Sequence, residues 1–543
     1  MRKAFVLCFV FSCVAFLCKA QSNYSWPIKG QFPLTGNYGE IRPNHFHMGL
    51  DLSTQNKENF PVLAIADGYV SRLRISSVGY GKSIYITHPD GHLSLYAHLN
   101  KFEEPLASYI SKIMLEQKVN EIDFTLPENV LQVQKGQKIG LSGNTGGSSG
   151  PHLHFEIRDT KSEIPLNPLL FYNHKDELTP VLTWMAVYDL KDSLKISAPA
   201  TNLYRIEKQT KDTAFVSPIE CKAAIVGLGF AGYDLLEKNG NKNQIAKAEL
   251  WFDTTLIYRH YFSQLQFDDA RYVNEFADKS GAHMVQRCFV PEQYPSGLHD
   301  VAINRGRVIF RDTLWHRYKL RLSDESGNQK LVIGTIRATA LNGYSSLSCQ
   351  KDFVRAGIEN TLQAGKFTLR FPAKSLYNSA CIQTLHSVKA FTIASSTLNL
   401  HTAIKVSCFD TSLSAGKKVL TNGGYCAAPK VQNDSIYWDI KSTGAWQVDL
   451  DKEGPQLKAN FAKGKHALHA KQLRFFISDK KSGIATYDLY INSNWVPVYY
   501  DAKSSQLILE LDDSIPKGLL QIKLLAKDKC GNTSTLQTTF NRL

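Results

Sequence analysis

The stretch that decides the fold is Gly150-Pro151-His152-Leu153-His154-Phe155-Glu156. Side chains alternate between the two faces of a β-strand, so residues two positions apart point the same way, about 6–7 Å apart along the strand. His152 and His154 therefore share one face, while Leu153 and Phe155 supply an apolar face. The pattern predicts a strand that packs on a core and presents two imidazoles on its other side.

A second cluster of histidines comes earlier, in Ile41-Arg42-Pro43-Asn44-His45-Phe46-His47-Met48-Gly49-Leu50-Asp51. His47 and Asp51 stand four residues apart, which would also suit one face of a helix. The proline and glycine in so short a segment favour a loop that runs into a strand instead. Between the two clusters, Asp90-Gly91 predicts a hairpin turn whose second strand ends near His98.

Imidazole and carboxylate groups are the ligands of catalytic zinc, which takes three ligands from the protein and leaves the fourth position to water. His47, Asp51 and His154 would make a site of that kind, with His98 and His152 uncoordinated beside the metal. No H-E-x-x-H occurs in the chain. The mechanism of the helical zincins, with its glutamate base, is therefore excluded.

The composition excludes several classes of protein. The 543 residues predict about three or four domains at the usual ~100–200 residues each. A hydrophobic share of 43% excludes a largely disordered or collagen-like chain. Beyond the first 20 residues no apolar run approaches the ~18 needed to cross a bilayer, which excludes a polytopic membrane protein. The formal net charge is +14, but the Lys and Arg residues are spread without basic runs, so no nucleic-acid partner is predicted.

Residues 1–20 have the layout of a secretory signal peptide, with Arg2 and Lys3 before an apolar run from Ala4 to Cys18. The competing interpretation is a lipoprotein anchored at Cys18. We therefore expect an exported protein of the periplasm, cell envelope or extracellular space. Seven of the ten cysteines follow this segment, so one or two disulfides are expected, with at least one thiol lacking an intrachain partner.

Further motifs accompany the two clusters in a fixed order. They are His47-Met48-Gly49-Leu50-Asp51, Pro61-Val62-Leu63-Ala64-Ile65-Ala66-Asp67-Gly68-Tyr69-Val70, Gly79-Tyr80-Gly81, Tyr96-Ala97-His98-Leu99, Val133-Gln134-Lys135-Gly136-Gln137-Lys138-Ile139-Gly140, and Gly143-Asn144-Thr145-Gly146 leading to His152-Leu153-His154-Phe155-Glu156. Together they make residues 28–175 resemble the lysostaphin-type zinc metallopeptidases, which have the duplicated hybrid motif fold and hydrolyse peptide cross-bridges of bacterial peptidoglycan.

The resemblance implies an antiparallel β domain with an open groove and Zn²⁺ held by His47, Asp51 and His154. It implies that His98 and His152 assist catalysis, and we favour His152 as general base and His98 as stabiliser of the oxyanion. Peptidoglycan peptides are the expected substrate, and a regulatory envelope protein is left open as a partner.

Three further residues or segments are assigned on weaker patterns. Tyr38 is our candidate for the family's aromatic oxyanion partner. Glu156 is expected either to support a histidine ligand or to be an ordinary surface carboxylate. An insertion at Glu103–Lys118 has apolar residues at helical spacing, and the helix would either flank the groove, as a restriction or lid, or pack on the sheet. His88 and His92, which flank the turn, are expected at the surface.

The rest of the chain has short alternating strands, so the fold class is mostly β, with two or three β-sandwich domains after the peptidase domain. We expect a signal peptide at 1–20, the peptidase at 21–177, a β-sandwich at 178–340, a strand-rich middle domain at 341–455 and an immunoglobulin-like sandwich at 456–543. The two sandwiches share a faint sequence repeat. The segment Asp324-Glu325-Ser326-Gly327-Asn328 has Asp, Gly and Asn at the same positions as Asp528-Lys529-Cys530-Gly531-Asn532. Both read as tight turns.

The expected function is an exported zinc endopeptidase of peptidoglycan. Its rivals are a non-hydrolytic binder or activator of hydrolases, a zinc endopeptidase of secreted proteins, and an adhesin dominated by the β modules. The five candidate residues favour catalysis over the binder, since non-hydrolytic members of the family typically lose metal ligands.

Overall fold

The computed structural model describes residues 24–30, 33–174, 176–190, 199–238, 240–341, 352–394, 398–410, 415–461, 466–467 and 471–543. The segment interpreted as a signal peptide lies outside these residues. Within them, no helix is long and apolar enough to cross a membrane. Cys381 is disulfide-bonded, which confirms that a disulfide is present. Within the described part of the chain, the free thiols are Cys221, Cys288, Cys408, Cys426 and Cys530.

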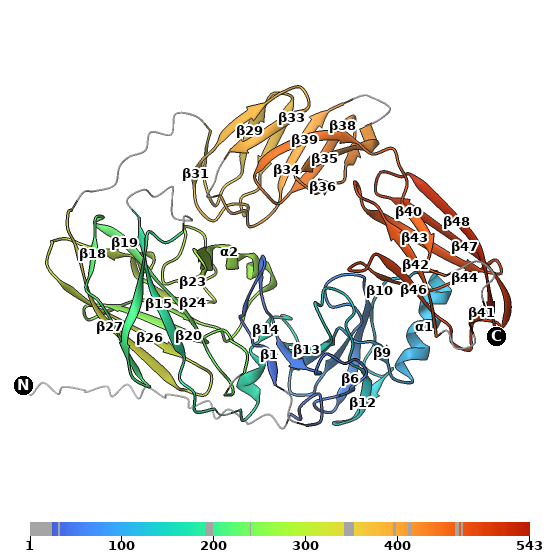
Figure 1. Cartoon of the computed structure of the whole chain (residues 1–543), viewed down its shortest axis with the longest axis horizontal. Helices are drawn as coiled ribbons and strands as arrows, with labels where there is room; N and C mark the ends of the chain where they lie inside the picture. Colours follow the sequence, from blue (N-terminus) through green and yellow to red (C-terminus); the bar gives the residue numbers. More distant parts are fainter. Residues whose placement is uncertain are drawn as a thin grey trace, which may run out of the picture.

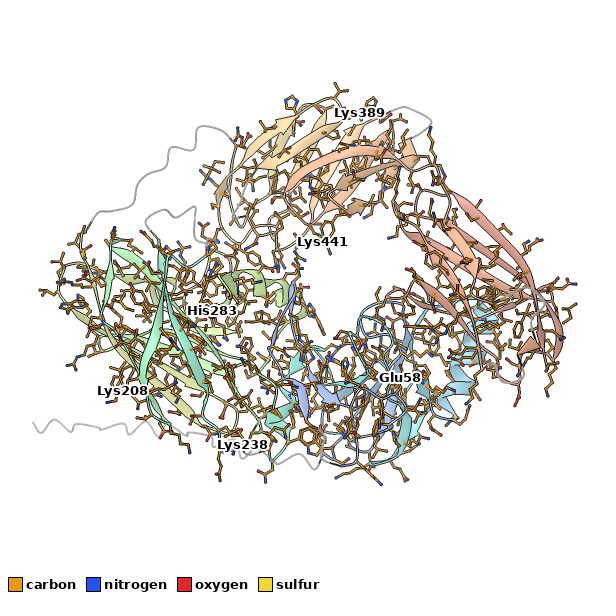
Figure 2. The ribbon with its side chains drawn as sticks, in the orientation of Figure 1. Glu58, Lys208, Lys238, His283, Lys389 and Lys441 are labelled. Carbon is orange, nitrogen blue, oxygen red and sulfur yellow. The ribbon has the colours of Figure 1, made fainter. Side chains whose placement is uncertain are left out.

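The chain forms four β parts that follow one another around a ring (Figure 1). The N-terminal part, in blue, is followed by the second part in green, the third in orange and the C-terminal part in red. The last part returns to lie beside the helix α1 (Leu106–Gln117) of the first. The exposed residues Lys208 and Lys238 lie on the second part, and the exposed Lys389 lies on the third part (Figure 2).

The N-terminal part is built on one large antiparallel sheet. In sheet order its strands are β1 (Leu34–Gly36), β4 (Leu50–Ser53), β13 (His152–Asp159), β8 (His92–Ala97), β7 (Ser83–Thr87), β6 (Gly68–Ile75) and β10 (Ile122–Thr125), with β11 (Gln132–Val133) on β6 and β14 (Pro165–Leu166) on β13. The smaller sheets are β5 (Pro61–Leu63), β12 (Lys138–Leu141) and β9 (Lys101–Phe102), and the pair β2 (Ile41–Arg42) and β3 (His45–Phe46).

Side chains alternate between the two faces of β13, so this strand contributes apolar residues to the core and histidines to the candidate site. Leu153, Phe155 and Ile157 are fully buried in the main apolar cluster, which also takes in Leu106, Ile110, Ile113 and Met114 of α1. The helix expected at Glu103–Lys118 is therefore confirmed, and its apolar face packs on this core. The hairpin expected at Asp90-Gly91 is also confirmed, since β7 and β8 pair antiparallel across it.

The second part is a 13-stranded sheet folded over its own core. In order its strands are β22 (Ala277–Ser280), β23 (His283–Arg287), β19 (Ile225–Tyr233), β15 (Val181–Asp189), β16 (Asn202–Gln209), β17 (Thr213–Val216), β27 (Gln329–Ala338), β26 (His316–Ser323), β20 (Lys247–Phe252), β21 (Thr255–Tyr261) and β24 (His299–Ala302), with β18 (Ile219–Cys221) on β27 and β25 (Val308–Ile309) on β19. Strand β16 joins the two halves, because it pairs with β15 on one side and β17 on the other. A 3₁₀ helix (Phe267–Tyr272) and α2 (Val273–Phe276) lie between β21 and β22.

The third part packs two sheets around one core. One holds β29 (Asn360–Ala364), β30 (Phe367–Phe371), β34 (Ile404–Phe409), β38 (Ser435–Ile440) and β37 (Lys430–Gln432); the other holds β32 (Gln383–His386), β33 (Ala390–Ala394), β39 (Gly444–Leu450), β35 (Lys418–Asn422) and β36 (Tyr425–Ala427). A short pair, β28 (Phe353–Val354) and β31 (Ala380–Cys381), lies beside them.

The C-terminal part also packs two sheets around a core. They are β40 (Gln456–Ala459), β42 (Gln472–Ser478), β46 (Gln506–Glu510) and β45 (Tyr499–Asp501), and β41 (His466–Ala467), β48 (Thr533–Arg542), β47 (Gly518–Asp528), β43 (Ile484–Ile491) and β44 (Asn494–Val496). The mostly β fold class with a small helical insertion is thus confirmed.

Candidate metal centre and active site

Three potential ligand atoms meet at the centre of the large sheet. Strand pairing places His154 directly opposite Asp51, and His47 lies just after β3. The Nε2 of His47, the Oδ1 of Asp51 and the Nδ1 of His154 are each 3.0 Å from the other two. A tetrahedral zinc with ligands at ~2.0–2.1 Å separates its ligand atoms by roughly 3.3 Å. The three buried residues therefore fit a single metal ion.

The free nitrogen of each histidine ligand is held by a second group. The Nδ1 of His47 lies 2.8 Å from the carbonyl oxygen of Asn37, and the Nε2 of His154 lies 2.8 Å from Oε1 of Glu156. Such bonds fix the tautomer of a ligand and the orientation of its ring. Each imidazole is thus oriented with its other nitrogen toward the metal position.

Glu156 has no exposed surface and joins three partners. It accepts a hydrogen bond from Tyr80 Oη at 2.5 Å and one from Arg158 Nε at 2.7 Å, besides its contact with His154. Burial alone would raise the pKa of Glu156, but the charge of Arg158 and the contact with His154 lower it to about 2. Glu156 is therefore a buried, charged support for a ligand, and the alternative of a surface carboxylate is wrong.

Asp51 is held from two sides. Its Oδ2 accepts a hydrogen bond from Arg42 Nη2 at 2.9 Å, and the Nε2 of His152 lies 3.3 Å from its Oδ1. Burial opposes the charged form, but the charge of His47 and the contacts with His152 and His154 hold the pKa of Asp51 well below its ordinary value. Asp51 is accordingly available as an anionic ligand.

His98 and His152 stand beside the three ligand atoms, with ring centres 4.8 Å apart. Both are fixed through Nδ1, which lies 2.8 Å from Thr145 O in His98 and 2.8 Å from Gly150 O in His152. This leaves the Nε2 atom of each ring available to accept or donate a proton. Burial and the neighbouring histidines lower the pKa of His98 to about 3, so this imidazole is neutral at physiological pH.

A pocket of about 440 Å³ opens over the site. Its walls include all five residues above together with Arg42, Tyr80 and Ser148. Phe267 and Ala270 of the second part close one side. An apolar cluster fixes that part in place, because Phe46 and Met48 pack with Phe262, Tyr272 and Phe276. The second part therefore contributes a wall to the pocket over the candidate site.

The C-terminal part reaches the other side, at the loop that holds His98. Tyr499 Oη accepts a hydrogen bond from the N–H of Gly146 at 2.8 Å, and Lys503 Nζ donates to the carbonyl oxygen of Asn144. Thr145 lies between these two residues and its carbonyl binds His98. Contacts from the end of the chain thus reach a candidate catalytic imidazole through one carbonyl group.

Two expectations for individual residues are wrong. Tyr38 is not at the site, because it is 1% exposed and donates to Pro165 O at 2.7 Å inside the apolar contact with the second part. The tyrosine that lines the pocket is Tyr80. His88 is 4% exposed, with its nitrogens near Asp67 O and Ser94 Oγ, so it is a buried structural residue.

Sequence reasoning missed Arg42 and Arg158, the two arginines that pair with the carboxylates of the site. Arg42 lies within the first cluster and Arg158 lies two residues after Glu156. The i, i+2 spacing of Glu156 and Arg158 on a strand was the available signal, because it places both on the face of His154.

Comparison with known proteins agrees with this geometry. The family model of peptidase family M23 matches residues 45–119 and 126–168. The chain is 32% identical over 133 residues to the DD-carboxypeptidase/endopeptidase Mpg of Neisseria meningitidis serogroup B, covering 24% of each chain. It is 31% identical over 150 residues to the murein hydrolase activator NlpD of Salmonella dublin, covering 28% of this chain and 31% of that one.

Among solved structures, the catalytic domain of lysostaphin from Staphylococcus simulans is 26% identical, covering 26% of this chain and 91% of that one, with a TM-score of 0.20. The chain spans between about a fifth and a third of the length of the curated relatives it matches. The family match covers the large sheet except for β1 and β10, and it includes the whole ligand cluster. The N-terminal part of the chain is therefore a peptidase M23 domain, and its resemblance to the lysostaphin-type peptidases is confirmed.

Proposed function

We propose that the chain is an exported zinc endopeptidase that hydrolyses peptide cross-links of bacterial peptidoglycan. The observation that carries the proposal is the triangle of His47, Asp51 and His154, with two uncoordinated imidazoles over it in an open pocket. The similarity to a named DD-carboxypeptidase/endopeptidase supports the substrate class. We keep the expected division into domains at 21–177, 178–340, 341–455 and 456–543 as part of this proposal.

His47, Asp51 and His154 would hold the metal, which supplies an activated water and polarises the scissile carbonyl when bound. His152 acts as the general base. Its Nδ1–H donates to Gly150 O, so its Nε2 carries the lone pair that accepts the proton of the attacking water. That Nε2 is 3.3 Å from the ligand atom of Asp51, which places it at the edge of the metal position.

His98 follows strand β8 and lines the same pocket as His152. In its neutral state its Nε2 accepts a hydrogen bond. Once the proton of the attacking water has passed to it from His152, it can donate a hydrogen bond to an oxyanion. The two imidazoles, with ring centres 4.8 Å apart, are close enough to share this work. Arg42 supports the charged form of Asp51, and Glu156 orients His154 so that its Nδ1 faces the metal position.

The test is mass spectrometry of fragments released from purified peptidoglycan by the full chain, with and without a chelator. His152→Ala is the test variant. His283→Ala, on β23 of the second part (Figure 2), is the matched control. We expect chelator-sensitive peptide fragments from the wild type and the control and none from His152→Ala. The fragment masses name the bond that is cut.

A second candidate is a non-hydrolytic activator of other hydrolases, favoured by the similarity to NlpD. No fragment release by a zinc-loaded protein that still sediments with peptidoglycan would reject the peptidase and support the activator. Cleavage of folded secreted proteins without release from peptidoglycan would instead support a peptidase of proteins.

A further inference from the structure

The pocket over the candidate metal centre is lined by residues of two kinds. The peptidase domain supplies small residues, among them Gly79, Gly147 and Ser148. Phe267 and Ala270 of the second part supply apolar side chains. Both lie outside the stretches that the peptidase family model matches. The shape of the pocket in this chain therefore depends on residues that the peptidase domain itself does not contain.

Phe267 and Ala270 belong to one short element, the wall segment (residues 267–276), which consists of the 3₁₀ helix and α2. They stand three positions apart, and a 3₁₀ helix has three residues per turn, so both lie on the same face. Phe267 is 43% exposed. Its ring therefore offers apolar surface to a peptide that enters the pocket.

The peptidase domain holds the residues that lead into the wall segment. The N–H of Leu265 donates to the carbonyl oxygen of Pro165 at 3.2 Å, and Nδ2 of Asn167 donates to the carbonyl oxygen of Phe262 at 3.0 Å. The apolar cluster between the two parts lies beside these bonds. The start of the wall segment is thus fixed to the domain that carries the metal ligands.

The third part of the chain holds the other end of the wall segment. Nε of Arg271 donates to the carbonyl oxygen of Leu400 at 3.2 Å. Nδ2 of Asn399 donates to the carbonyl oxygen of Asn274 at 3.0 Å and to Oε1 of Glu275 at 2.8 Å. Because hydrogen bonds from two other parts hold it, the segment forms a fixed wall of the pocket and not a lid.

The ring of Phe267 lies close to the metal centre. The guanidinium carbon of Arg158 lies over it, 4.7 Å from the ring centroid. Arg158 in turn donates to Glu156, which contacts His154. Each residue of an extended peptide advances the chain by ~3.3 Å. A substrate residue next to the bond at the metal position therefore comes within reach of Phe267.

The volume of the pocket leaves little room for substrate side chains. The pocket measures about 440 Å³, which is near the lower end of the ~300–1,000 Å³ range of ligand pockets. It has to hold the peptide backbone on both sides of the scissile bond. Since Phe267 and Ala270 occupy one side, a small side chain fits there and a branched one meets the ring.

We propose that Phe267 and Ala270 determine the specificity of the site, by selecting peptides whose residue beside the scissile bond has a side chain no larger than that of alanine. This inference rests on the proposed peptidase function. A cross-link made through alanine or glycine meets the requirement, whereas most bonds in secreted proteins do not. The second part of the chain thereby directs the metal centre toward cross-links of the wall.

The test gives the zinc-loaded full chain an equimolar mixture of synthetic cross-linked stem peptides with alanine, valine or leucine at the cross-link. Mass spectrometry of the products yields the ratios of kcat/KM. We expect the wild type to prefer alanine over leucine by at least about tenfold, and Phe267→Ala to lower this preference to less than about threefold. Ala270→Leu, which narrows the pocket, should lower cleavage of the alanine peptide itself by about tenfold.

Phe215→Ala is the matched control, because Phe215 is also 43% exposed but lies on β17, away from the pocket. It should keep the wild-type preference, and bound zinc is measured in every variant. A wild type without preference, or a zinc-loaded Phe267→Ala with undiminished preference, overturns the inference.

Failure of the peptidase itself would look different, since the wild type would then cleave none of the peptides. Isothermal titration calorimetry of the same peptides with the zinc-loaded chain decides the inference in that case. Tighter binding of the alanine peptide that Phe267→Ala removes supports the selective wall. Equal affinities for the three peptides, or no binding, overturn it.

Discussion

Replacing Glu156 by glutamine tests whether this buried carboxylate supports the metal centre. The substitution keeps the size of the side chain and removes the charge that faces His154 Nε2 at 2.8 Å and Arg158 Nε at 2.7 Å. Arg158 is 3% exposed, so it loses its counter-charge in a buried setting. Breaking a buried pair on one side costs about 3–5 kcal/mol, and the strongly lowered pKa of Glu156 agrees with a loss of this size.

The Glu156→Gln substitution also weakens the hydrogen bond that orients the metal ligand His154. Losing the group that orients a ligand typically lowers metal affinity by about 10–100-fold. We therefore expect Glu156→Gln to lower the free energy of unfolding of the zinc-free protein by about 3 kcal/mol and to raise the zinc dissociation constant at least about tenfold. Urea unfolding measures the first and competition with a chromophoric chelator the second.

Glu163→Gln is the matched control. Its carboxylate lies 3.8 Å from the same Arg158, but the side chain is half exposed, and exposed pairs of this kind contribute little. If Glu156→Gln binds zinc as tightly as the control and unfolds within about 0.5 kcal/mol of it, the assignment of Glu156 as support for His154 is wrong.

Three further predictions address other parts of the account. His98→Ala should lower the rate of peptide release by about 10²–10⁴-fold while one zinc per chain is retained, and loss of zinc instead would make His98 a ligand. Tyr499→Phe should lower kcat by about 3–10-fold with KM unchanged, through loss of one hydrogen bond to the loop that holds His98; Tyr490→Phe is the control, and equal activities would refute the coupling. Burial lowers the pKa of His260 to about 3 and that of His299 well below its ordinary value. Both bind protons more readily when unfolded, so stability is complete above about pH 6.5 and falls by about 2 kcal/mol per histidine by pH 5. A flat urea-unfolding profile between about pH 7 and 5 would contradict this.

Local rules predicted much of the site. Strand alternation placed the apolar Leu153 and Phe155 in the core and His154 on the opposite face, where pairing with Asp51 completes the cluster. The turn at Asp90-Gly91 and the helix at Leu106–Gln117 followed from residue type and spacing in the same way. Each of these features depends on neighbours a few residues apart.

Alternation alone could not place His98. This residue has a positive φ of 58°, just past the end of β8, so its side chain leaves the alternation of the strand. Its position depends on Thr145, which lies 47 residues later and holds its Nδ1. Tyr38 was misplaced for a related reason, since the apolar contact that buries it is made by residues of the second part.

The contacts that other parts of the chain make with the pocket and with the loop beside it were beyond the reach of sequence patterns. Phe267 belongs to the second part, and Tyr499 contacts Gly146 from 353 positions away. Such contacts arise because whole parts of the chain pack against one another around the ring. The spacing of residues within a short stretch of sequence does not predict them.

The central claim is that a zinc ion held by His47, Asp51 and His154 drives hydrolysis of peptidoglycan peptides. The most direct measurement adds zinc stepwise to the chelated full chain and follows, in the same samples, bound zinc and peptide fragments released from purified peptidoglycan. The account predicts that release rises in proportion to zinc up to one equivalent, and that Asp51→Ala shows neither tight binding nor release. Release that is unchanged by removing zinc, or that persists in Asp51→Ala, would contradict it.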